Sequence, residues 1–154
     1  MVNGVMEEIV CARRTLDLSD TALRLLPDDE ARTVFQLAEA HFVATPNRRW
    51  WWEDFRIPAV TRHFADGRGF EWLTWIVPSP AEVVWWIVEE ARRPFFAVYE
   101  ADVATIQQIL GECYPFEYYL IPKDRRWLLC ENHSDVLCAI GEEVQHKLKA
   151  VEAA

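Results

Sequence analysis

The amino-acid sequence predicts an α+β fold in a single domain spanning its 154 residues. In the first third of the chain, apolar residues recur at helical spacing. The second half consists of short runs rich in aromatic and β-branched residues, and one helical segment, 102–113, interrupts them. We therefore expect N-terminal helices within 1–45 packed on a mostly antiparallel sheet of about five or six strands within 68–141. One crossover helix and a C-terminal helix over about 142–152 complete the expected fold.

The N-terminal region is expected to be helical. The segment "VMEEIVCARRTL" places its apolar residues roughly on one face, with acidic residues early and basic residues late, as the helix dipole favours. "DLSDTALRLLP" carries Ser and Asp as possible caps and predicts a short turn of helix. Pro27 is tolerated in the first turn of the next helix, which has to end before Pro46.

Five runs in the second half predict strands, and "KDRR" between the last two is a plausible hairpin connection. The runs cover residues 70–78, 82–90, 94–101, 116–122 and 127–132. Between the third and fourth runs, Asp102 is the expected N-cap of a helix that ends near Gly111. The segment 136–141 suits either a last strand or the start of the final helix. A strand is favoured because Gly141 inside a helix would cost about 1 kcal/mol relative to Ala.

Composition and charge limit the classes of partner. The net charge is −9, and an acidic surface repels the phosphates of nucleic acids and anionic lipids, so neither nucleic acid nor membrane is expected as a partner. The charge suits a basic protein partner, or it serves solubility alone. No signal peptide, membrane-length apolar run or CxxC pair is evident, which favours a cytoplasmic protein with reduced thiols. No motif predicts a cofactor.

The aromatic content is high for one core, with eight Trp, eight Phe and four Tyr. Some of these rings are therefore expected to line a groove or an interface. In an extended "WWW" run, Trp50 and Trp52 would share one face and Trp51 would take the other. At least one indole should then lie at the surface or be pinned beneath a loop. A structural pin is favoured, and an exposed binding patch is the alternative. Flanking arginines can stack on these rings: Arg48, Arg49 and Arg56.

The stretch "WLLCENHSD" combines a thiol, an imidazole and carboxylates. In a continuous strand, Cys130 and His133 would point to opposite faces and could not bind one metal ion, and a structural zinc site needs four ligands. The apolar run "WLLC" predicts a buried, inert thiol. "ENHSD" predicts a polar turn in which Asn132 and Asp135 bond to their own backbone and His133 is exposed. Because functional residues concentrate on loops, this turn is a candidate for recognition.

The C-terminal block resembles small bacterial proteins of uncharacterised function. The resemblance rests on Tyr118, Tyr119, Lys123, Asp124, Trp127, Glu131, Asn132, His133 and Asp135. It covers about a fifth of the chain and implies no established activity. In size and acidity the chain is also similar to immunity-type proteins, which neutralise toxins from competing cells.

We therefore expect binding rather than catalysis, in an immunity or regulatory role. The candidate binding residues are Trp50, Trp51, Trp52, Glu131, Asn132, His133 and Asp135. One alternative is a small hydrolase or metal-binding enzyme that uses Glu131, His133 and Asp135. Another is a structural subunit whose surplus aromatic residues form a homodimer interface.

Overall fold

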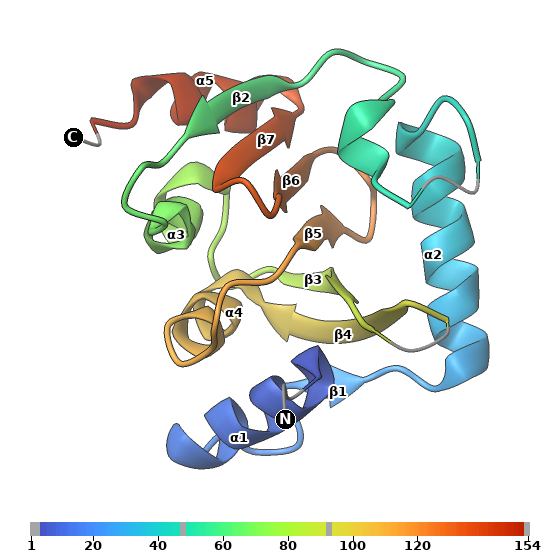
Figure 1. The fold of residues 1–154 in the computed structure, drawn as a ribbon, viewed down its shortest axis with the longest axis vertical. Coiled ribbons are helices and arrows are strands. Elements are labelled where there is room, and N and C mark those ends of the chain that lie inside the picture. Colours follow the sequence, from blue (N-terminus) through green and yellow to red (C-terminus); the bar gives the residue numbers. More distant parts are fainter. Residues whose placement is uncertain (1–3, 47–48, 92–93, 153–154) are drawn as a thin grey trace.

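A seven-stranded sheet occupies the centre of the protein, and each strand runs antiparallel to its neighbours in the order β1-β4-β3-β5-β6-β7-β2 (Figure 1). The computed structural model describes residues 4–46, 49–91 and 94–152. Within them the strands are β1 (Arg24–Leu25), β2 (Val60–His63), β3 (Val83–Glu89), β4 (Phe96–Asp102), β5 (Tyr118–Pro122), β6 (Leu128–Glu131) and β7 (Val136–Ile140). The helices are α1 (Val5–Thr15), α2 (Asp28–Phe42), α3 (Leu73–Ile76), α4 (Val103–Leu110) and α5 (Glu142–Ala150), with short 3-10 turns η1 (Trp51–Glu53) and η2 (Gly69–Trp72).

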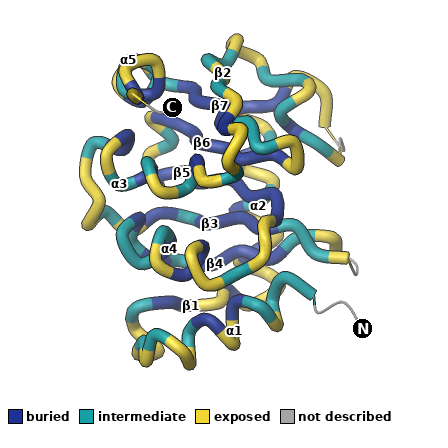
Figure 2. The backbone as a smooth tube through the Cα atoms, turned by 60° about the vertical axis from the view of Figure 1, so that its left-hand side comes forward, coloured by how far each residue is buried: buried dark blue, intermediate teal, exposed yellow. Residues whose placement is uncertain are grey.

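Helices cover both faces of the sheet, so the apolar side chains form two cores. Helices α1, α3, α4 and α5 pack on one face, which we call the four-helix side. Helix α2 and residues 50–55 pack on the other, which we call the α2 side (Figure 1). Strands β5 and β6 are buried along their whole length, as Figure 2 shows. Burial on both faces explains why these strands are continuously apolar rather than alternating.

The α+β prediction is confirmed, and several of its elements are correct. Helix α4 links β4 to β5, and the Asp102 side chain caps it by accepting a hydrogen bond from the Thr105 backbone N at 2.8 Å. The ambiguous segment 136–141 forms strand β7, and α5 begins directly after Gly141. Gly141 has a φ of +110°, a region that residues with a Cβ rarely adopt. A glycine therefore stands at the boundary between β7 and α5 because the backbone there has a positive φ.

The prediction of a strand over 70–78 is wrong. These residues form η2 and α3, and their buried members Leu73, Ile76 and Val77 follow helical spacing. A short apolar run does not distinguish a strand from a buried helical turn. Pro78 then disfavours a helical conformation at Val77, which is extended.

The predicted strand count and the boundaries of the helical region also need correction. Residues 18–27 do not form a turn of helix: they contain a turn and the two-residue strand β1, which pairs with β4. Strand β2 was not predicted, yet it forms the opposite edge of the sheet by pairing with β7. Both edge strands are too short for periodicity to reveal them, and only their partners define them. The sheet therefore has seven strands and begins well before residue 68.

Replacing Gly141 with Ala is expected to destabilise the fold by about 2–4 kcal/mol, since the new side chain combines a strained backbone with a steric clash. A Cβ at this position would lie 2.8 Å from Trp127 Cβ and 2.9 Å from the Arg126 carbonyl oxygen. Urea denaturation measures the change. Gly111→Ala is the matched control, because the backbone at Gly111 has a φ of −65° and the nearest atom to a Cβ is 3.4 Å away. Equal effects of the two substitutions would contradict this account.

Candidate functional site

The irregular segment before β2 is anchored by one buried indole. Trp51 is 1% exposed, and its ring packs against Phe35 and Tyr119 with centroid distances of 4.7 and 4.9 Å. Its backbone N donates a hydrogen bond to the Tyr119 hydroxyl at 3.1 Å, and its Nε1 donates to Glu39 at 3.3 Å. Trp51 is thus a structural pin that ties the segment to both α2 and the sheet.

The two neighbouring indoles turn away from Trp51 and contact the β6–β7 turn. Trp50 and Trp52 stack with a centroid distance of 6.1 Å. The imidazole of His133 lies 5.2 Å from the Trp50 ring and 5.7 Å from the Trp52 ring. The structure therefore brings the two regions that the sequence proposed separately, residues 50–52 and the turn after β6, into one cluster. We call Trp50, Trp52 and His133 the indole–histidine cluster.

A buried carboxylate that the sequence analysis missed holds this cluster. Glu117, only 3% exposed, accepts a hydrogen bond on Oε1 from Trp52 Nε1 at 2.9 Å, and His133 Nδ1 lies 3.3 Å from the same atom. Burial raises the pKa of Glu117, while the bonds to Trp52 and His133 act in the opposite direction. The sequence does contain a signal for this residue. Glu117 stands two residues before Tyr119 at the start of an apolar run, so strand alternation places both side chains on the same face of the sheet.

The turn after β6 has the local geometry that its sequence predicts. Asn132 Oδ1 accepts hydrogen bonds from the backbone N of Ser134 at 2.8 Å and of Val136 at 3.2 Å. Asp135 has a φ of +61°, which aspartate tolerates better than most residues. Asn132 itself is buried, so it shapes the turn from beneath, while the side chain of His133 is 52% exposed.

Glu131 lies on the other side of the sheet from His133. Strand alternation directs Leu129 and Glu131 to the four-helix side, where Glu131 pairs across the strands with Tyr118, and a Cβ on Gly69 would lie 3.3 Å from its Oε2. Burial raises the pKa of Glu131 to about 7, and the negative charge of Asp135 adds to this effect. The structure therefore does not bring Glu131 and His133 together.

The thiol of the "WLLC" run is buried on the α2 side. Cys130 pairs across the strands with Cys138, and burial raises its pKa well above the usual value. Among the described residues, no group of three His, Cys, Asp or Glu side chains is arranged to hold a metal ion.

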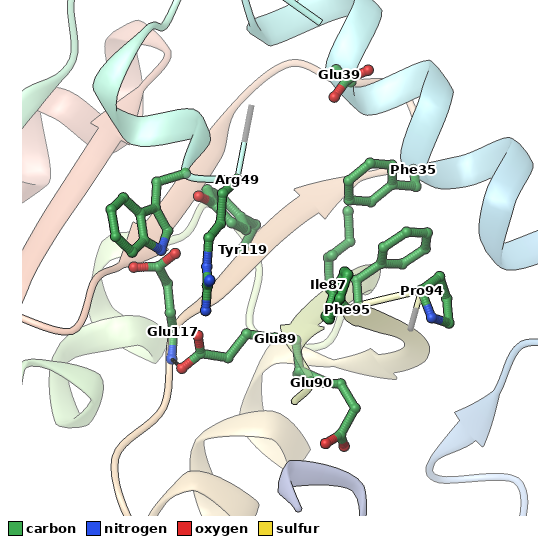
Figure 3. A pocket seen from close by; sticks show the side chains of 13 residues that line it. Phe35, Glu39, Arg49, Ile87, Glu89, Glu90, Pro94, Phe95, Glu117 and Tyr119 are labelled. Carbon is green, nitrogen blue, oxygen red and sulfur yellow. Dashed lines mark hydrogen bonds between the residues drawn. The ribbon is translucent and has the colours of Figure 1, made fainter. Parts of the chain in front are cut away.

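A pocket of about 590 Å³ opens beside the indole–histidine cluster (Figure 3). Trp50 of the cluster and Glu117, which bonds to the other two members, both line it. Its walls combine aromatic rings with carboxylates, and we call it the acidic–aromatic pocket. It is lined by Phe35, Glu39, Arg49, Trp50, Ile87, Val88, Glu89, Glu90, Pro94, Phe95, Phe96, Glu117 and Tyr119.

Two carboxylates of the pocket are neighbours on the sheet. The Glu89 backbone N donates to the Glu117 carbonyl oxygen at 3.1 Å, and the Glu117 backbone N donates to Glu89 Oε1 at 2.9 Å. The charge of Glu89 raises the pKa of Glu117 further, beyond the effect of burial. A cation bound between the two carboxylates would be stabilised by both.

Comparison with known protein families assigns the chain to one of them. Residues 3–152 match the model described as "Family of unknown function (DUF6756)". The chain belongs to this family. No curated protein and no solved structure matches it. The DUF6756 assignment accords with the resemblance to proteins of uncharacterised function.

In the part of the chain that the structure describes, no helix combines the length and apolar character needed to cross a bilayer.

The elevated pKa of Glu131 predicts a pH-dependent stability. A glutamate with a pKa of about 7 in the folded chain and 4.5 in the unfolded chain binds more protons when folded, so its contribution to the free energy of unfolding decreases as pH rises between these values. Glu131→Gln should therefore match the wild type near pH 4 and exceed its stability by about 3 kcal/mol above pH 7. Urea denaturation across this pH range measures the difference.

Glu112→Gln serves as the control for the loss of one carboxylate, because Glu112 is exposed beyond the end of α4. A difference in the free energy of unfolding between Glu131→Gln and the wild type that stays constant with pH would contradict the raised pKa of Glu131.

Proposed function

We propose that the protein is a non-catalytic binding module that receives a basic side chain of a partner protein in the acidic–aromatic pocket. The observation that carries this proposal is the pairing of Glu89 and Glu117 beneath an aromatic wall that includes Trp50. Charge and apolar surface occur together there, as binding of a long cationic side chain requires.

Both carboxylates retain an oxygen for a ligand. Glu117 Oε1 is engaged by Trp52 and His133, and Glu89 Oε1 accepts from the Glu117 backbone. Within the described part of the chain, no hydrogen bond reaches the Oε2 atom of either residue. A cation would therefore add a partner without displacing an existing bond.

The aromatic wall suits the apolar stem and the charge of a basic side chain. Trp50, Phe95 and Phe96 line the pocket, and cations bind favourably over such rings. Phe95 is 53% exposed and has a φ of +70°, a strained conformation for a bulky residue. Strain of this kind concentrates at binding sites, which supports a role for this ring in recognition.

The net charge of −9 supports the same class of partner. A strongly acidic protein attracts a basic one over distances comparable to the Debye length, and the pocket then supplies a specific contact. Neutralisation of a basic partner is the mode of action that an immunity or regulatory protein of this kind would use.

Titration with a peptide of alternating arginine and glycine, followed by isothermal calorimetry, tests the proposal. The wild type should bind this peptide and not a peptide of alternating glutamate and glycine. Glu89→Gln should weaken binding about tenfold, since it removes one charge at the site but keeps the oxygen that accepts from Glu117.

Glu112→Gln removes the same charge from an exposed residue that does not line the pocket and controls for general attraction. Equal weakening by the two variants, or no binding by the wild type, would refute the pocket as the site of recognition. A rise in salt should weaken wild-type binding more than that of Glu89→Gln.

A further inference from the structure

One cation of the chain itself lies in the acidic–aromatic pocket. The guanidinium carbon of Arg49 is 5.4 Å from the centre of the Trp50 ring, over its face. Figure 3 shows the Arg49 side chain extending towards the part of the pocket where Glu89 and Glu117 lie. The position that a bound cation would take is thus close to one that an internal arginine takes.

Arg49 is weakly held. It is exposed, and no hydrogen bond or ion pair joins it to another residue in the described part of the chain. The firm attachment of its segment begins at Trp51, whose backbone and indole both bond to neighbouring elements. Rotation of the Arg49 side chain out of the pocket would therefore break no hydrogen bond or ion pair with the residues that the structure describes.

The pocket suits a guanidinium better than an ammonium group. A guanidinium is planar, stacks on aromatic rings and has five N–H donors that can bond to more than one carboxylate. Trp50 supplies the flat surface, and the Oε2 atoms of Glu89, at the end of β3, and Glu117, directly before β5, supply acceptors. A lysine ammonium is more strongly hydrated and lacks the flat surface.

We infer that Arg49 is an internal competitor that covers the Trp50 face of the pocket, next to the cation position, and is displaced by an arginine side chain of the partner. This inference rests on the proposed function. It adds that the ligand is a guanidinium group and that Arg49 limits the affinity of the pocket for it. Occupation by Arg49 lowers the fraction of molecules that are ready to bind, and the apparent dissociation constant rises in proportion.

Binding of the arginine–glycine peptide to Arg49→Ala tests the competitor. The variant should bind about three- to fivefold more tightly than the wild type, as removal of a weak cation–π contact allows. Arg56→Ala is the matched control for charge, because Arg56 is exposed, belongs to the same segment and donates its Nε to the Ala40 carbonyl oxygen rather than lining the pocket.

The outcomes separate the two proposals. Absence of wild-type binding would refute the proposed function. Wild-type binding with no greater gain for Arg49→Ala than for Arg56→Ala would leave the proposed function intact and refute the competitor. A lysine–glycine peptide that binds Arg49→Ala as tightly as the arginine peptide would refute the preference for guanidinium.

Nuclear magnetic resonance supplies a readout that does not depend on affinity. The Arg49 Nε–H signal is identified by its loss in Arg49→Ala and should be shifted upfield by the Trp50 ring current. Saturation with the arginine peptide should move it to the position typical of exposed arginines. A signal that keeps its position while the peptide binds would show that Arg49 is not displaced.

Discussion

The buried indole of Trp51 is the interaction on which the arrangement of the candidate site depends. It joins α2, through Phe35 and Glu39, to β5, through Tyr119, and so fixes a segment that has little regular structure. Because adjacent side chains diverge, burial of Trp51 directs Trp50 towards the sheet surface beside it. The position of Trp50 in the pocket wall thus follows from the burial of Trp51, which does not itself line the pocket.

Strand alternation is the second constraint, and it separates groups that are close in sequence. Glu131 is directed to the four-helix side, whereas His133, two residues later but beyond the end of β6, packs against indoles on the α2 side. The sheet lies between them, so proximity in the sequence carries no chemical coupling. Glu117 replaces Glu131 as the carboxylate partner of His133, because its strand presents it on the same side.

Much of the fold could be predicted because its signals are local. Helix α2 has an apolar stripe, α4 has its Asp102 cap, and the turn at Asn132 bonds to its own backbone. The segment 70–78 was predicted wrongly because four or five apolar residues fit a strand and a short helix equally well. The two edge strands escaped prediction because a short strand is defined by its partner rather than by its own residues.

The sequence alone determined the α+β class, the acidic character and the two regions that carry the candidate residues, since composition, periodicity and turn chemistry are properties of neighbouring positions. Only the tertiary structure decided that these regions meet, that Trp51 is buried while Trp50 lines a pocket, and that Glu117 joins them. Pairing between strands far apart in the chain sets these contacts. The pattern within one strand indicates which face a residue takes, but not which distant segment will pack against that face.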